Sequence, residues 1–209
     1  PDTTVEKQRD FALANGRQAA EWQELLVRML DTLGDAIGGL PATSKLALIY
    51  ERIDRPDDAL AMHRRTLGLA DKINSRPHQA TAWLYVGQWY RQHERWPEAL
   101  DAVNRCLTLA ADAAKPAVRM SLARVYQAME LNDEALSQYE QAYEQIRKTD
   151  ALSDQFACLR EIALMRMKLG RRDKAIAALQ DAIDIAHALE LRDEQRLREQ
   201  LEQWKKNGT

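Results

Sequence analysis

The feature that most constrains this chain is a repeat. An alanine followed by Leu or Ile opens four similar segments, at Ala59, Ala99, Ala135 and Ala175. Apolar or aromatic residues recur about 4, 8 and 11 positions after each alanine, which is the stripe of an amphipathic helix. A period of roughly 36 to 40 residues predicts a repeat protein in which each unit buries its apolar face against its neighbours.

The residues before each alanine repeat as well. In the second copy Val86, Gly87 and Tyr90 precede the alanine by 13, 12 and 9 positions, and the other copies carry comparable residues there. A residue without a bulky side chain lets two backbones approach closely. Short polar turns precede Pro56 and Pro97, and proline is favoured in the first turn of a helix. The pattern predicts two packed helices in every unit.

Together these residues resemble the tetratricopeptide repeat. The closest copy reads Trp83-x2-Val86-Gly87-x2-Tyr90-x8-Ala99, and the fourth copy is looser, with Arg166 in place of the aromatic residue. The resemblance implies an all-α, right-handed superhelical solenoid of helix-turn-helix repeats. The spacing exceeds the family's usual period of about 34 residues, which predicts longer second helices. It is similar to the spacing in kinesin light chains, Rap-type peptide receptors and the sensor domain of maltose-regulator-like transcription factors.

Four repeats are expected within residues 41–192, at about 42–77, 78–116, 117–152 and 153–192. Residues 1–40 resemble a degenerate earlier unit, with a turn at Asn15-Gly16-Arg17 and then a second-helix stripe one repeat length before that of Ala59. That stripe contains Trp22, Leu26 and Met29. The run Gly38-Gly39-Leu40-Pro41 is expected to break the chain.

The C-terminal residues 193–209 differ from the repeats. Leu197, Leu201 and Trp204 form a narrow apolar stripe among charged and amide side chains. A helix of this kind suits the end of a solenoid, where a polar outer face is needed. We therefore expect a capping helix, followed by a frayed tail at residues 207–209.

Composition supports helices and excludes several classes of protein. Eight Gly and six Pro among 209 residues are too few for an all-β fold. Thirty basic and 32 acidic residues give a net charge of −2, so neither nucleic acid nor a membrane is expected as a direct partner. Without a long apolar run or a signal peptide, the chain is expected to be cytoplasmic. Nothing in the sequence fixes the oligomeric state.

The sequence has no motif for chemistry. It lacks a P-loop, a Rossmann glycine pattern, His-Glu-x-x-His and Cys-x-x-Cys, and its four histidines are scattered. We therefore expect no enzymatic activity, no catalytic residue, no metal and no cofactor. Cys106 is expected to be buried and inert, and Cys158 to be more exposed. The five tryptophans are assigned to the core, with Trp22 and Trp204 at its two ends.

The resemblance also implies a binding surface, because first helices line the inner groove of tetratricopeptide arrays. The peptide-binding residues expected there are Arg52, Leu84, Gln88, Arg91, Met120, Arg124, Gln127, Arg160 and Lys168. Cationic, amide and apolar side chains on one concave face suit an extended acidic peptide or a C-terminal carboxylate. A solvated face whose arginines pair with nearby acids explains the same residues equally well.

The sequence therefore predicts a non-enzymatic scaffold that binds a protein or peptide in its groove. The asparagine-rich carboxylate clamp of chaperone-binding members is not reproduced. The alternative is a ligand-sensing or regulatory module excised from a larger signalling or transcription-regulating protein. The missing N-terminal Met favours that alternative.

Overall fold

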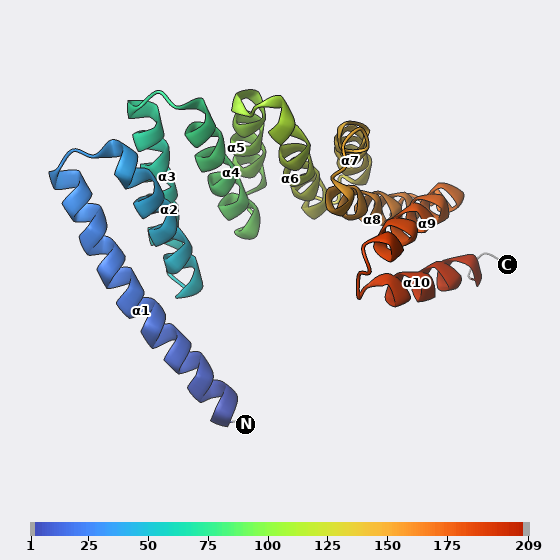
Figure 1. The fold of residues 1–209 in the computed structure, drawn as a ribbon, viewed down its shortest axis with the longest axis horizontal. Coiled ribbons are helices and arrows are strands. Elements are labelled where there is room, and N and C mark those ends of the chain that lie inside the picture. Colours follow the sequence, from blue (N-terminus) through green and yellow to red (C-terminus); the bar gives the residue numbers. More distant parts are fainter. Residues whose placement is uncertain (1–2, 207–209) are drawn as a thin grey trace. The chain divides into compact units, whose positions relative to one another are not determined.

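The computed structural model describes residues 3–206, and in this part of the chain every regular element is a helix (Figure 1). The expected all-α repeat architecture is confirmed. By contacts the chain divides into two compact units, residues 1–110 and 111–209. Among the described residues, no helix combines the length and the apolar character needed to cross a membrane.

In its described residues the first unit contains five helices, each packed on the next along the chain. They are α1 (Thr3–Thr32), α2 (Ala36–Arg52), α3 (Pro56–Lys72), α4 (Arg76–Gln92) and α5 (Trp96–Leu109). The α2–α3 and α4–α5 pairs form the most extensive contacts, so these are the helix-turn-helix units. In Figure 1 they follow the long α1, from blue to green.

The second unit continues the pairing. It consists of a short 3-10 turn η1 (Asp112–Ala114), α6 (Lys115–Ala128), α7 (Asn132–Ile146), α8 (Leu152–Lys168), α9 (Arg172–Ala188) and α10 (Glu194–Lys206). Pairs α6–α7 and α8–α9 pack together, and α10 packs on α9. Leu197 and Leu201 of α10 are buried, as a capping helix requires, while the tail at 207–209 lies outside the described residues.

One turn type joins the two helices of every pair. Asp54, Glu94, Glu130 and Gly170 have a positive φ of 57° to 70°. In each case the next residue donates its backbone N–H to a carbonyl five positions back, as Arg55 does to Tyr50 at 2.9 Å. This closes a Schellman motif, which satisfies carbonyls at the end of the first helix. The turn thereby redirects the chain without leaving the helix end unpaired.

The long spacing was expected to come from longer second helices, but it arises from both helices of a pair. Helices α2, α3 and α4 each have 17 residues, whereas α5 and α6 have 14. The interval from Ala59 to Ala99 therefore covers two long helices, and the shorter interval from Ala99 to Ala135 covers two short ones. Each extra turn lengthens the apolar stripe that its neighbour must cover.

Two expected breaks near the N-terminus do not occur. Helix α1 passes through Gly16 without a turn, and this glycine lies against Ile53, the residue at which α2 ends. A Cβ at Gly16 would lie 2.5 Å from the Ile53 Cγ2 atom, so this is a close helix–helix crossing rather than a loop.

The second expected break lies inside a helix. Pro41 sits within α2, where it removes one backbone hydrogen bond. The helix continues because Asp35 caps its start by accepting from the Gly38 N–H at 2.9 Å. Beyond the proline, Ala42 and Thr43 are buried against the rest of the unit. The packing of these neighbours offsets the lost hydrogen bond.

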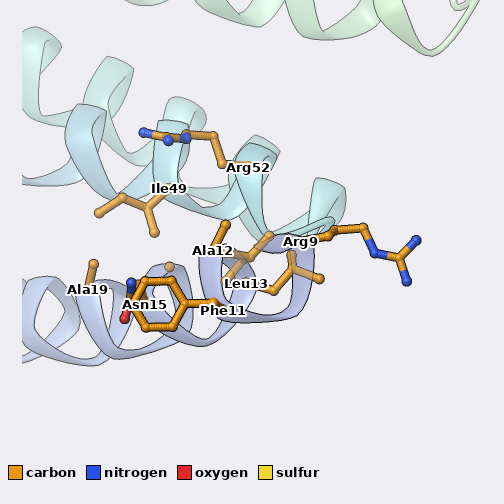
Figure 2. Close-up of a pocket in the computed structure, with 10 residues that line it drawn as sticks. Arg9, Phe11, Ala12, Leu13, Asn15, Ala19, Ile49 and Arg52 are labelled. Carbon is orange, nitrogen blue, oxygen red and sulfur yellow. The ribbon is translucent and has the colours of Figure 1, made fainter. Parts of the chain in front are cut away.

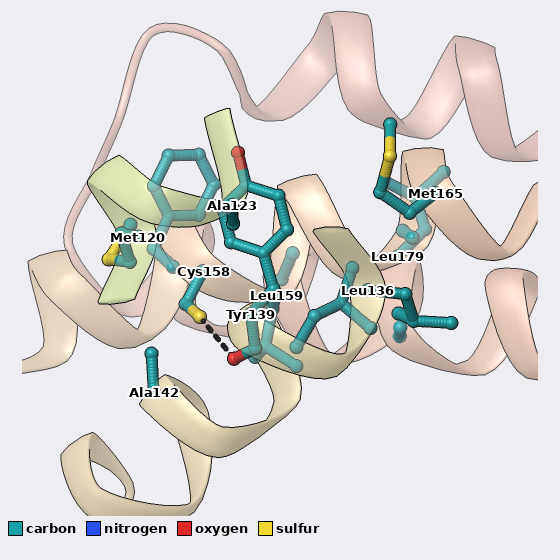
Figure 3. Packing of buried hydrophobic residues seen from close by; sticks show 14 of the residues in the cluster. Met120, Ala123, Leu136, Tyr139, Ala142, Cys158, Leu159, Met165 and Leu179 are labelled. Atoms are coloured by element: carbon teal, nitrogen blue, oxygen red, sulfur yellow. Dashed lines mark hydrogen bonds between the residues drawn. The ribbon is translucent and has the colours of Figure 1, made fainter. Parts of the chain in front are cut away.

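The core of the second unit is closely packed (Figure 3). Tyr139 is fully buried, and its backbone carbonyl accepts a hydrogen bond from the Cys158 thiol at 3.1 Å. Cys158 is 0% exposed, so the expectation of an accessible thiol is wrong. The pattern of α8 alone could not show this, because the element that covers the thiol is α7. Cys106 in the first unit is buried as expected.

The first unit confirms one expected contact and overturns another. Gly87 of α4 is buried against α5, where an added Cβ would lie 2.6 Å from the Val103 Cγ2 atom. Trp22, in contrast, is 68% exposed and is not a core residue. Its side of α1 is apolar, but no described element covers it.

Candidate functional site

The expected binding residues lie on first helices, and each unit presents its own set. In the first unit, Arg52 is exposed at the C-terminal end of α2. Leu84, Gln88 and Arg91 recur at intervals of four and three positions along α4, so they share one face of that helix. All three are partly exposed. The first unit therefore offers Arg52 and an amphipathic face of α4 to solvent.

The charges of this surface are unevenly paired. Within the described residues, neither the Arg52 nor the Arg91 side chain has a hydrogen bond or an ion pair. Glu51 precedes Arg52 in α2, and its carboxylate lies 2.9 Å from Nε2 of the buried His63. This carboxylate therefore has a structural partner, which leaves the two arginines without an acid of their own.

A pocket of about 550 Å³ lies between α1 and α2 beside Arg52 (Figure 2). Phe11 and Leu13 come from α1, and Ile49 comes from α2 and faces them. Arg9 is at the rim and its guanidinium points away from these apolar side chains. The pocket is thus an apolar recess next to a cationic edge. It went unpredicted because the sequence suggested a turn at Gly16, where α1 in fact continues.

The second unit differs from the expectation at Met120. Its side chain is only 8% exposed and packs in the core cluster shared by α6, α7 and α8, so it is not an open groove contact. It forms part of the wall of a pocket of about 600 Å³, whose rim carries Lys148 but also Asp112 and Asp154. The mixed charge of that rim makes it a poorer site for an anion.

Two further residues of the second unit have structural partners. The Gln127 amide oxygen accepts a hydrogen bond from the Tyr139 hydroxyl at 3.1 Å. Burial raises the pKa of this tyrosine, and the neighbouring Arg124 opposes that rise because it stabilises the phenolate. Both side chains of α6 therefore serve the α6–α7 pair as well as the surface.

The remaining cations of the second unit lie on α8. Arg160 forms an ion pair with Glu161 at 3.1 Å and lies over the Phe156 ring. Lys168 is exposed, and no side-chain partner is present for it in the described part of the chain. Arg160 thus fits the alternative explanation of the surface, in which arginines pair with nearby acids. That explanation does not hold for the two arginines of the first unit.

Comparisons with known proteins agree with this architecture. The family described as tetratricopeptide repeat matches residues 40–112. No curated protein sequence matches the chain. Residues 40–112 span the two pairs of the first unit, where the sequence motif is clearest.

Solved structures with similar folds cover most of the chain. A putative kinesin light chain with nearly identical TPR-like repeats from Podosopora anserina has a TM-score of 0.71 and 20% identity, over 90% of this chain and 96% of that one. BtubC from P. vanneervenii has a TM-score of 0.69 and 16% identity, over 88% and 91%. MamA has a TM-score of 0.58 and 20% identity, over 79% and 96%. At these identities the similarity shows the fold alone.

Proposed function

We propose that this chain, which carries tetratricopeptide repeats, binds an acidic segment or a C-terminal carboxylate of a partner protein. Repeats of this kind are generally protein-interaction scaffolds, and the fold is typically non-catalytic. The chemistry of the bound segment is inferred from the exposed faces of the first helices. A ligand-sensing module of a larger protein remains the alternative prediction.

The observation that carries this proposal is the state of Arg52. It is exposed, it has no acidic partner among the described residues, and it borders an apolar pocket of about 550 Å³. Arginine donates paired hydrogen bonds to a carboxylate, and an adjacent apolar recess accepts a neighbouring side chain. A carboxylate flanked by an apolar residue matches both features.

Other arginines of the first unit show the contrast. Arg55 and Arg95 precede second helices and form ion pairs with Asp58 and Glu98 three positions later. Such pairs use up the positive charge locally. Arg91 on α4 lacks this kind of partner in the described residues. Its charge is therefore available to a ligand, and the other side chains on the same face of α4 can contact the rest of it.

The proposal is tested by titrating the chain with fluorescent peptides of Asp, Glu and one terminal Leu, with a free or an amidated C-terminus. We expect Arg52→Glu and Arg91→Glu each to weaken binding about tenfold or more, since a hydrogen bond to a charged group contributes about 1.5–3 kcal/mol. Binding should also weaken as salt rises, because exposed charges are screened beyond about 10 Å at 0.1 M.

The matched control is Lys72→Glu, which makes the same charge change at the exposed end of α3. It should leave affinity nearly unchanged. If all three variants weaken binding equally, the effect is one of net charge and the site is elsewhere. If Arg52→Glu or Arg91→Glu lowers helicity, these arginines are structural and the proposed site is wrong.

A further inference from the structure

Helix α1 presents an uncovered apolar stripe. We call Phe11, Trp22, Leu25, Leu26, Met29 and Leu33 the α1 stripe. Their exposed fractions range from 38% for Leu26 to 72% for Leu33. At about 100° per residue they lie on one side of the helix, and Ala20, Gln23 and Val27, which are buried, lie on the other side. A large exposed apolar patch on an ordered helix indicates an interaction surface.

Helix α1 takes the place of a second helix that has no first helix paired with it among the described residues. Three side-chain hydrogen bonds join equivalent positions across successive elements: Tyr50 to Glu24, Arg64 to Tyr90, and Arg166 to Glu140. They show that α1 packs on α2 in the same register as α3 on α4 and α7 on α8. Positions in α1 and α3 therefore correspond one repeat length apart, with Glu24 equivalent to Arg64.

The equivalent positions of α3 are the ones that contact its own first helix. Leu26 corresponds to Thr66, whose hydroxyl lies 2.8 Å from that of Thr43 in α2. Met29 corresponds to Leu69, which lies against the backbone of α2 at a glycine. In α3 Thr66 is buried and Leu69 is partly buried, whereas Leu26 and Met29 are 38% and 54% exposed. Leu26 and Met29 of the α1 stripe therefore lie where a paired first helix would pack.

We propose that α1 of a second copy of this chain covers the α1 stripe, antiparallel to the first, in a two-fold symmetric dimer. A two-fold interface must be self-complementary. Within the stripe, the midpoint between Trp22 and Met29 is also the midpoint between Leu25 and Leu26, and these four residues are all exposed. Antiparallel pairing about this point places apolar residues of one copy opposite apolar residues of the other.

Charge favours the same arrangement. Glu21 and Arg28 flank the stripe on one side, one before its middle and one after it, and Arg28 also forms an exposed ion pair with Glu24 of its own helix at 3.5 Å. A two-fold axis between antiparallel helices keeps this flank on the same side in both copies, so each Glu21 approaches the Arg28 of the other copy. Parallel copies would place the two flanks on opposite sides of the interface, where this pairing is lost.

The area of the stripe is also sufficient. Its five residues from Trp22 to Leu33 expose on the order of 600 Å² of mostly apolar surface, which is the lower end of the roughly 600–1,000 Å² per partner of stable interfaces. Apolar surface of this extent is unfavourable in water, and a second α1 helix would bury it. Area and charge therefore both support a second copy as the occupant.

The test is the oligomeric state of the full chain, measured by sedimentation velocity over a range of concentrations. We expect a monomer–dimer equilibrium. Trp22→Glu combined with Met29→Glu should raise the dissociation constant on the order of 100-fold or more, because symmetry removes each contact twice. Leu152→Glu is the matched control, since Leu152 is 38% exposed but lies on α8. Glu21→Arg should weaken the dimer, and adding Arg28→Glu should restore it.

Three results would overturn the proposal. If the chain is a monomer at about 100 μM, a second copy is not the natural occupant of the α1 stripe. The same conclusion holds if that monomer binds unrelated amphipathic helical peptides. A dimer that survives the Trp22 and Met29 changes would use another surface. Failure of the Arg28→Glu change to restore the dimer would exclude the antiparallel pairing. Should the double variant lose helicity, Leu33→Glu provides the same test, because Leu33 follows the end of α1 and is 72% exposed.

Discussion

Replacement of Gly87 by alanine tests the close packing of α4 on α5. The new Cβ would lie 2.6 Å from Val103 Cγ2 and 3.4 Å from both the Ala102 Cβ and the Val103 backbone nitrogen. Val103 is 1% exposed, and its branched side chain has one preferred rotamer in a helix, so it has little room to move. We expect a packing penalty of about 1–3 kcal/mol.

Alanine also has a higher helix propensity than glycine, which offsets about 1 kcal/mol of that penalty. The net effect of Gly87→Ala is therefore a loss of roughly 0–2 kcal/mol in the free energy of unfolding. Gly68 in α3 isolates the propensity part, because a Cβ there would meet nothing within 4 Å. Gly68→Ala should stabilise the protein by about 0.5–1 kcal/mol.

The assay is urea unfolding followed by far-ultraviolet circular dichroism on both variants and the parent. The two substitutions should differ by about 1–3 kcal/mol, in favour of Gly68→Ala. Adding Val103→Ala removes the atom that the new Cβ would meet, so this second change should be less destabilising in the Gly87→Ala background than alone. If Gly87→Ala stabilises as much as Gly68→Ala, α4 and α5 do not approach closely at this residue.

Three further predictions concern the cap and the cysteines. Deletion of residues 193–209 removes Leu197 and Leu201 from the core, so we expect the truncated chain to self-associate in light scattering beyond the level of the intact chain, while a Leu152→Glu variant does not. Burial raises the pKa of Cys106 to about 11 and of Cys158 to about 12, so both thiols should resist a disulfide reagent at pH 8 until denaturant is added. Because unfolded thiols ionise near pH 9 while the folded ones stay protonated, the melting temperature should fall as pH rises from about 9 towards 11, and replacing either cysteine by alanine should flatten this decline.

Local patterns in the sequence determined much of the fold. The recurring alanines and their stripes predicted where paired helices lie, because a helix with about 3.6 residues per turn must place its apolar residues on one side. The same pattern predicted that Gly87 lies at a helix–helix contact and that residues 193–206 cap the last pair. The first-helix positions of Arg52 and Arg91 also followed from the repeat alignment. These features depend on residues close together in the chain.

Only the tertiary structure decided which of these faces are covered. Trp22 was expected on a core stripe, yet it is 68% exposed. Met120 was expected in an open groove, yet it is only 8% exposed. The sequence shows that a helix face is apolar, but the presence of a neighbour depends on elements far along the chain. Gly16 was likewise expected in a turn, but α1 continues through it and it lies against Ile53 at the end of α2. Packing between elements, which no local pattern encodes, sets both outcomes.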